Sequence, residues 1–415
     1  MKNDAVYRNT MGFFAAASLL CYPVALLLVK GGMNVILLFM LLLALITWLK
    51  PWRGVQGMAW QPAWNGYIWA MFGLTLAILF SQFVNADWAA HPHDAPSRYW
   101  LALPVFFLLL KLPGQIVRAL EFGFPLAAML GLLLAKETGA GLTLPTLDKI
   151  HYGDYLLLFG VLSLFMLDWF GRDGWPLRLW KWLGCAAGVA AAVASGTRGA
   201  LLAIPVFIAV YLVFRTSKLS ARTLAQSAML GAALLGVAYL ASQTAQHRLE
   251  QLAYDISHYE QGERDTSTGI RWQLYQVAAE IFLAHPLAGV GPQGFARQMS
   301  LMEQAGKLTP MAAELGRGEV HNDVLAKAAG MGVPGLLAML ALYGVPLAMF
   351  WHKAQVAQQA ARRAAILGVA LVAGHIVFGL TVEFLNLTMT AAFYGFSVAV
   401  LLAACYHPEL NAGKE

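Results

Sequence analysis

Residues 32–49 read GMNVILLFMLLLALITWL, a run without one charged side chain. A helix of about 20 apolar residues is long enough to cross the hydrocarbon core of a bilayer. The whole chain has this character, because 59% of its 415 residues are hydrophobic and only 12% are charged. Soluble domains usually carry about 25% charged residues. The sequence therefore predicts an all-α polytopic membrane protein, and it excludes a disordered chain, a disulfide scaffold and a nucleic-acid-binding module.

Apolar segments of similar length predict about twelve transmembrane helices along the chain. They cover residues 10–29, 32–49, 66–85, 98–112, 116–135, 152–170, 180–196, 199–215, 223–242, 324–351, 362–381 and 387–406. Pro104 interrupts the fourth of these segments, which is also the shortest. The first segment is long enough to span, and no small-residue cleavage site follows it, so we expect a retained helix.

These spans divide the chain into three parts. Residues 1–242 hold the first nine spans, residues 243–323 form one long polar loop, and residues 324–415 hold the last three spans and a cytoplasmic tail. Lys and Arg accumulate in short loops on the cytoplasmic side of a membrane. If the N-terminus is cytoplasmic, the short loops on the far side hold only these basic residues: Lys30, Arg98, Lys136, Lys149 and Arg198. Both ends of the chain are then predicted in the cytoplasm, with the long loop across an inner membrane.

The long loop is predicted to contain two amphipathic helices. TAQHRLEQLAYDISHYEQ (244–261) is typical of a helix lying across the surface, and IRWQLYQVAAEIFLA (270–284) of a second helix. One face of the second helix collects apolar residues at helical spacing: Ile270, Leu274, Val277, Ile281 and Phe282. HPLAGVGPQGF (285–295) then predicts a Pro/Gly turn, since its glycines neither follow a strand nor open a nucleotide-binding helix.

The most specific local pattern is HNDVLAKAAGMGVPG at residues 321–335. His321 stands where the long loop enters the tenth span, and an imidazole facing water is well matched to general-base work near neutral pH. The alternative is that His321 and Asn322 only cap the N-terminus of a helix. Gly332 and Gly335 place small residues on this span, which predicts the close approach of another helix.

Two arginines on the same side of the membrane are candidates for binding an anion. Arg198 lies in SGTRGA, a tight hairpin whose positive charge runs against the positive-inside trend. A guanidinium binds phosphate oxygens in a bidentate manner and stays charged at any relevant pH. The alternative is a side chain that reaches the lipid headgroups. Arg271 begins the second amphipathic helix, where the alternative is a solvated or acid-paired side chain.

The loop after the third span contains Asp87, His91, His93 and Asp94 in the Pro-rich context HPHDAP. Such side chains bind metals, but their spacing here matches no familiar site. We therefore expect no metal.

Three ionisable side chains in or near the late spans need partners, because charge is costly in lipid. His375 and Glu383 are expected to face inward and are secondary functional candidates. Lys327 is expected to pair with Asp323, which lies four residues earlier on the same helix.

Three of these stretches, taken in order, resemble the bacterial O-antigen ligases. They are SGTRGA around Arg198, the stretch from Arg271 through HPLAGVGPQGF, and HNDVLAKAAGMGVPG from His321. The family pattern of His followed by Asn, Ser or Gln, then nine residues and Gly-two-Gly, fits the last stretch without a gap. Twelve spans with one long periplasmic loop agree as well, so the resemblance covers essentially the whole chain. The wider superfamily also contains O-antigen polymerases and protein O-oligosaccharyltransferases.

The resemblance implies an inverting, metal-independent glycosyltransferase with a GT-C-like helical fold and no cofactor. Its donor would be O-antigen polysaccharide on undecaprenyl diphosphate and its acceptor lipid A-core, as in lipopolysaccharide biosynthesis at the periplasmic face of the Gram-negative inner membrane. The family's catalytic histidine corresponds to His321, and its diphosphate-binding arginines correspond to Arg198 and Arg271. Three further motif positions would support the site: Asn322, Gly332 and Gly335. The expected partners are these two glycolipids and membrane lipids, without nucleic acid.

Other functions fit parts of the same pattern. An O-antigen polymerase would use the same donor with a second lipid-linked glycan as acceptor. A protein O-oligosaccharyltransferase is less expected, because that group usually carries further periplasmic sequence after its spans. A lipid-linked-sugar flippase or secondary transporter also fits twelve spans, but transporters tend to show paired halves with broken helices at the midplane. The single long loop, late in the chain, disfavours that class.

Overall fold

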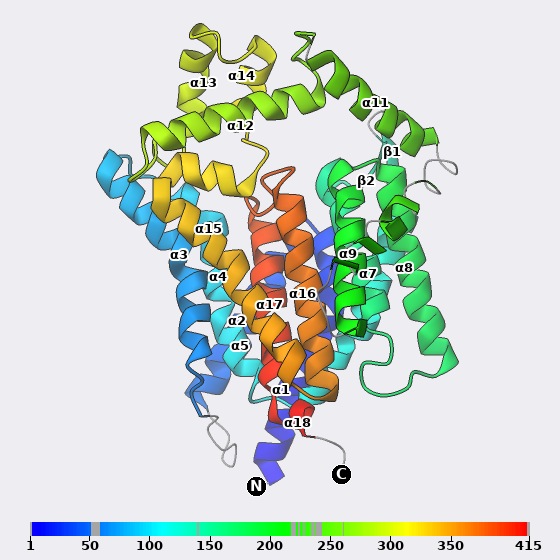
Figure 1. Cartoon of the computed structure of the whole chain (residues 1–415). Coiled ribbons are helices and arrows are strands. Elements are labelled where there is room, and N and C mark those ends of the chain that lie inside the picture. Colours follow the sequence, from blue (N-terminus) through cyan, green and yellow to red (C-terminus); the bar gives the residue numbers. More distant parts are fainter. Residues whose placement is uncertain are drawn as a thin grey trace.

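A computed structural model of the chain describes residues 2–50, 59–138, 141–216, 221–222, 225–226, 229–233, 236, 243–259 and 261–412. Helices dominate it (Figure 1). Their bounds are α1 (Lys2–Leu28), α2 (Gly32–Leu49), α3 (Ala63–Asn85), η1 (His91–His93), α4 (Asp94–Leu101), α5 (Leu103–Leu109), η2 (Gly114–Ala119), α6 (Leu120–Leu133), α7 (Lys149–Phe165), α8 (Trp175–Ser195), α9 (Arg198–Thr216), α11 (Gln243–Tyr259), α12 (Ser267–Ala284), α13 (Gly294–Gln304), α14 (Pro310–Gly316), α15 (Asp323–Val356), α16 (Gln359–Gly379), α17 (Thr388–Tyr406) and α18 (Pro408–Asn411).

A short antiparallel hairpin interrupts the helices. It is formed by β1 (Lys136–Thr138) and β2 (Gly141–Thr143) and follows α6. The sequence did not predict these strands, because each is only 3 residues long and leaves no alternating apolar pattern.

Within the described residues, 8 helices are long and apolar enough to cross a membrane. They are α1, α2, α3, α6 together with η2, α8, α15, α16 and α17. This confirms a helical polytopic membrane protein. The total of twelve spans stays a prediction. Shorter helices lie at three of the other predicted spans: α4 with α5 at 98–112, α7 at 152–170 and α9 at 199–215. Most of the remaining span, 223–242, lies outside the described residues.

Helix α17 forms the centre of the bundle (Figure 1). Within the 18-residue apolar window of this helix, 94% of the residues are buried. It contacts α1, α2, α4, α5, α15 and α16. A helix that is apolar on every face is stable only when other helices surround it or lipid replaces them. A sequence without charge between Thr388 and Tyr406 permits this central place.

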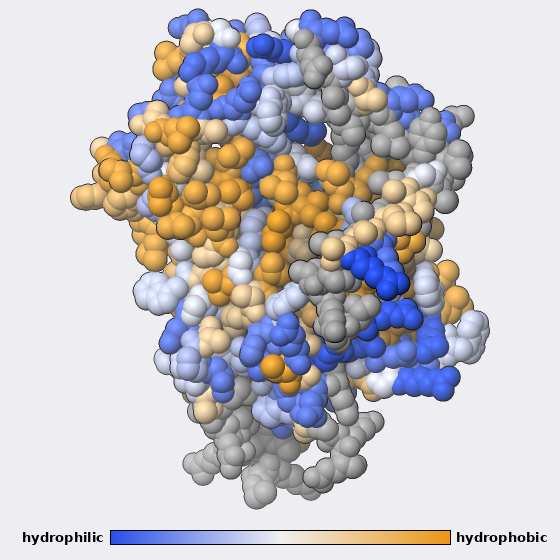
Figure 2. Space-filling model, in the orientation of Figure 1, coloured by the Kyte–Doolittle hydropathy of each residue, from blue (hydrophilic) through white to orange (hydrophobic). Residues whose placement is uncertain are grey.

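The two ends of the bundle differ in what covers them. The N- and C-termini lie at the same end, and the layer of α11 to α14 covers the opposite end (Figure 1). Apolar side chains form a belt over the middle of the molecule, with polar side chains above and below it (Figure 2). This distribution fits a body that crosses a bilayer.

Helix α12 fixes this outer layer to the bundle through its apolar face. Ile270, Leu274, Val277 and Ile281 are buried, as the helical spacing predicted, and Phe282 is half-buried. The four buried residues belong to a separate small core that includes residues from α13, α14 and α15. The layer is therefore a packed subdomain rather than an extended loop.

The turn between α12 and α13 packs against α15 through backbone atoms. Gly332 leaves helical geometry, with φ 65° and ψ −152°, and the next amide, Val333 N–H, donates to Pro286 O at 2.7 Å. A Cβ on Gly332 would lie 2.8 Å from the Ala288 nitrogen. Gly332 therefore admits the 286–289 turn, whereas a Cβ on Gly335 would meet Lys327 and Met331 of α15 itself. The expectation that these two glycines admit another helix is wrong.

Gly289 provides a test of this contact. It has φ 63°, and a Cβ there would overlap the carbonyl of Gly330. Gly306 is the matched control, because its φ is 71° but nothing lies within 4 Å of its added Cβ. Alanine costs roughly 1–2 kcal/mol at either position through the left-handed backbone, and overpacking adds roughly 1–3 kcal/mol at Gly289 alone. We expect Gly289→Ala to lower the melting temperature in detergent well below that of Gly306→Ala. Equal melting temperatures would contradict the contact.

Candidate functional site

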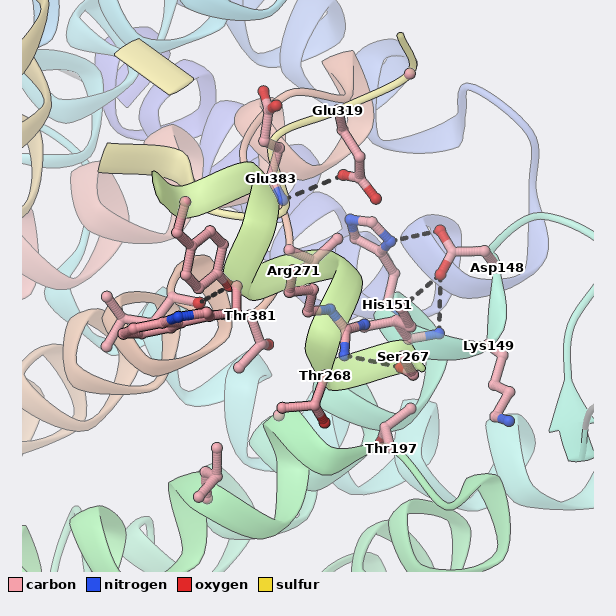
Figure 3. A pocket seen from close by; sticks show the side chains of 18 of the residues that line it. Asp148, Lys149, His151, Thr197, Ser267, Thr268, Arg271, Glu319, Thr381 and Glu383 are labelled. Carbon is pink, nitrogen blue, oxygen red and sulfur yellow. Dashed lines mark hydrogen bonds and ion pairs between the residues drawn. The ribbon is translucent and has the colours of Figure 1, made fainter. Parts of the chain in front are cut away.

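A cavity of about 1080 Å³ lies beside α12, at the end of the bundle opposite the termini (Figure 3). Its walls come from the start of α7, the turn between α8 and α9, helices α11 and α12, the segment before His321, and the segment 380–387. These segments lie far apart in the sequence. The cavity therefore exists only in the folded chain.

Arg271 projects from the first turns of α12 into this cavity (Figure 3). Its Nη1 lies 3.4 Å from the hydroxyl of Ser267, one helical turn earlier. Trp272 and Tyr275 of the same helix also line the cavity. The second amphipathic helix thus directs one face to the small core and presents Arg271 to the cavity.

The hairpin around Arg198 forms the opposite wall. Thr197 and Gly199 line the cavity, and Arg198 begins α9 between them, although its side chain lies outside the part that the structure describes. The turn is tight: a Cβ on Gly199 would lie 2.8 Å from Thr381 Oγ1 and 3.1 Å from the Asp154 carboxylate oxygens. The structure thus brings the Arg198 backbone and the Arg271 side chain to one cavity.

His321 lies beside this cavity and reaches it through Glu319. The His321 side chain is only 15% exposed, and its Nδ1 lies 2.7 Å from Glu319 Oε1. His321 has φ 62°, a conformation that is uncommon for a residue with a side chain. Tyr275 donates its hydroxyl hydrogen to the His321 carbonyl at 2.9 Å, which ties this backbone to α12. Glu319 itself lines the cavity.

The sequence did not single out Glu319, although it stands two residues before the motif. Burial raises the pKa of its carboxyl group, but contact with His321 and a hydrogen bond from the Glu383 amide, 3.3 Å away, outweigh burial and lower that pKa overall. The carboxylate is therefore charged at neutral pH. A charged carboxylate 2.7 Å from Nδ1 favours the tautomer with its hydrogen on that nitrogen, which leaves Nε2 as the acceptor.

A second acid–histidine pair lies in the same cavity and was also missed. Asp148 caps α7 by accepting from Ile150 N at 2.8 Å and His151 N at 3.1 Å, and its carboxylate contacts His151 Nδ1. Burial opposes ionisation of Asp148, but the contacts with His151 and the two amides lower its pKa overall. His151 is buried against Phe384, with ring centroids 4.9 Å apart. The only signal in the sequence is an Asp before an apolar run, which is typical of any helix cap.

Lys327 and Glu383 meet on the far side of Glu319. The Lys327 ammonium lies 3.6 Å from Glu383 Oε2, whereas the Asp323 carboxylate accepts from Tyr343 at 2.8 Å. The predicted pairing of Lys327 with Asp323 is therefore wrong, because the chain returns to place Glu383 closer. Burial raises the pKa of Glu383, although Lys327 opposes this, and Val320 N donates to it at 2.7 Å.

His375 lies within the bundle and is buried, as its cost in lipid required. Its Nδ1 lies 2.8 Å from the Leu371 carbonyl, one turn earlier on α16. The expected inward partner of His375 is therefore a backbone carbonyl group of its own helix.

Two side chains of the acidic and histidine cluster after α3 make polar contacts with other helices. Asp87 lies 2.6 Å from Arg297 of α13, and His93 lies 2.9 Å from Gln82 of α3. Among the described residues, no group of three His, Cys, Asp or Glu side chains is arranged to hold a metal ion.

Part of the region that builds this site matches a known family model. A family model described as O-antigen ligase matches residues 183–340, a stretch that contains Arg198, Arg271 and His321. This stretch of the chain is therefore similar to the O-antigen ligase family. The matched region runs from α8 to the first half of α15 and includes the whole outer layer.

Individual relatives are distant from this chain in sequence. An uncharacterized protein of Haemophilus influenzae is 22% identical over 334 residues, which cover 76% of this chain and 80% of that protein. An O-antigen ligase of Escherichia coli is 23% identical over 147 residues, or 35% of each chain. Protein LicB of Haemophilus influenzae is 29% identical over 111 residues, which cover 27% of this chain and 37% of that protein.

Asn322, the second residue of the family pattern, caps α15. Its side-chain oxygen accepts from Leu325 N at 3.0 Å, so the capping interpretation of the His-Asn pair holds for Asn322. His321 precedes the cap and contacts Glu319 instead.

Asn322 therefore allows a test that separates capping from substrate binding. Asp caps a helix about as well as Asn, whereas Ala at this position costs about 1 kcal/mol. We expect Asn322→Ala to lower the free energy of unfolding by about that amount. Asn322→Asp should keep both the stability and the enzymatic activity of the wild type. A stable Asn322→Asp variant without activity would assign the amide to the substrate.

Proposed function

We propose that the chain is an inverting glycosyltransferase that moves O-antigen polysaccharide from undecaprenyl diphosphate to lipid A-core. The supporting observation is one cavity, at the end of the bundle opposite the termini, that is lined by the Arg198 hairpin and by Arg271, with His321 beside it in contact with the lining residue Glu319. With both termini in the cytoplasm of a Gram-negative cell, this end faces the periplasm, where both glycolipids are exposed.

The donor diphosphate would bind between Arg271 and the hairpin of Arg198. A departing lipid diphosphate gains negative charge, and fixed guanidinium groups can neutralise that charge without a metal. The rim of the cavity suits the lipid, because exposed apolar side chains lie on three of its walls: Leu202 is 56%, Trp272 52% and Leu387 43% exposed. A polyprenyl chain would leave the cavity over these side chains into the bilayer.

His321 would receive the proton of the acceptor hydroxyl. As the hydroxyl oxygen attacks the anomeric carbon, the new glycosidic bond forms and the bond from that carbon to the diphosphate oxygen breaks. The bonding pair leaves with the diphosphate, and the proton passes to His321. Glu319 contacts the other ring nitrogen, because its Oε1 lies 2.7 Å from Nδ1. Attack opposite the leaving group inverts the anomeric carbon.

The deciding experiment uses purified protein, lipid-linked O-antigen and lipid A-core, with the products separated on a gel. A capped lipopolysaccharide is the expected product. Extension of the glycan on undecaprenyl would favour a polymerase, and the absence of any covalent product would favour a transporter.

His321→Ala is expected to reduce transfer by at least roughly 100-fold, because a positioned general base contributes about 10²–10⁴. The control is His352→Ala, an exposed histidine of α15 far from the cavity, which should keep wild-type activity. Normal transfer by a folded, inserted His321→Ala protein would rule out the base.

A further inference from the structure

A second cavity, of about 520 Å³, lies on the opposite side of the segment that precedes His321. It is bounded by α3 and α4, by the turn before α13, and by the start of α15. In Figure 1 these elements stand on the side of the molecule away from α7, α8 and α9, which border the first cavity. Ligand pockets in proteins commonly have volumes of about 300–1,000 Å³.

The two cavities share a thin wall. Gly318, Glu319, Glu383 and Asn386 line both of them. Oε1 of Glu319 lies 2.7 Å from Nδ1 of His321. Groups bound on the two sides would therefore meet at the carboxylate that holds the proposed base.

The second cavity has the chemistry of a sugar site. Its side chains include Gln293 and Asn386, which both donate and accept hydrogen bonds, and Arg297, which Asp87 holds at 2.6 Å. Sugar hydroxyls also donate and accept, so such a mixture satisfies them.

We propose that this second cavity binds the terminal sugar of the acceptor glycan. The inference rests on the proposed function, in which the diphosphate occupies the first cavity. An inverting transfer needs the acceptor opposite the leaving group, and two cavities on either side of Glu319 supply that arrangement. The acceptor hydroxyl loses its proton to His321 as its oxygen bonds to the anomeric carbon, while the diphosphate departs on the Arg271 side.

Ala296→Trp tests the assignment by filling the second cavity, which Ala296 lines from α13. We expect the KM for lipid A-core to rise by roughly tenfold or more, equivalent to about 1.4 kcal/mol, with unchanged binding of undecaprenyl diphosphate. Leu301→Trp is the matched control, because Leu301 lies on the same helix, is 58% exposed and is absent from the lining. Its KM values should match those of the wild type.

The melting temperature of each variant shows whether it is folded. Gln293→Ala gives a second, milder test, because the Gln293 side chain is exposed. If Ala296→Trp is folded and both variants keep the wild-type KM for lipid A-core, the acceptor assignment is overturned and the proposed function stands. If the wild type itself forms no glycosidic product, the proposed function fails first.

An independent observation concerns His151 in the first cavity. Its Nδ1 contacts Asp148, and its Nε2 is buried without a hydrogen-bond partner among the described residues. Figure 3 draws this second nitrogen on the side of the ring away from Asp148, toward Glu319. An unpartnered buried polar atom is costly, and a ligand that accepts its hydrogen bond removes that cost.

We infer that His151 Nε2–H donates to an oxygen of the donor diphosphate, beside Arg271. Asp148 acts as its positioning residue, because it holds the proton on Nδ1 and favours the imidazolium. The ionisable groups around the ring are Asp148 and Asp154 on α7, Glu319 across the cavity and Arg271 on α12. An oxygen of the diphosphate would accept hydrogen bonds from His151 and Arg271 together.

His151→Ala is expected to weaken binding of undecaprenyl diphosphate by roughly tenfold, the loss of one charge-assisted hydrogen bond, and to leave the KM for lipid A-core unchanged. Asp148→Asn keeps the helix cap but removes the negative charge, so its donor affinity should fall more steeply than that of the wild type as pH rises. The control is His285→Ala, an exposed histidine at the end of α12. Unchanged donor binding by folded His151→Ala would overturn this role.

Discussion

The contact between the 286–289 turn and α15 is the constraint on which the site depends. Val333 N–H donates to Pro286 O at 2.7 Å, Val290 N–H donates to Ala329 O at 3.1 Å, and Ser81 of α3 donates to Ala288 O at 2.6 Å. Backbone can approach backbone this closely only where side chains are missing. These bonds fix the outer layer on the bundle, and Arg271 and Glu319 are held over the helices as a result.

The fixed layer brings separate motifs together beside one cavity. Arg271 comes from the layer, the Arg198 hairpin from the bundle, and His321 from the junction between them. Transfer from a lipid carrier needs a site that both membrane lipid and water-exposed glycan can enter. A cavity with apolar side chains at its rim and charged side chains on its walls meets both needs.

Acidic side chains organise the basic ones at this junction. Glu319 contacts His321, Asp148 contacts His151, and Glu383 lies 3.6 Å from Lys327. Glu319 and Asp148 lie two and three residues from their histidines, whereas Glu383 is distant in sequence from Lys327. In a partly buried setting, such pairs fix the direction of a proton or a charge rather than add much stability. The preorganised charge suits a leaving diphosphate.

The sequence alone determined the membrane fold class, eight of the predicted spans, the apolar face of α12 and the motif around His321, because apolar length and helical spacing are local properties. Only the tertiary structure decided the partner of Lys327, the turn that packs on Gly332, and the acids Asp148 and Glu319. The contacts of Lys327 and Gly332 join segments far apart in the chain. Asp148 and Glu319 lie three and two residues from their histidines, but only the fold brings these two pairs to one cavity. No local pattern encodes them, because the free energy of a buried charge depends on what folding brings beside it.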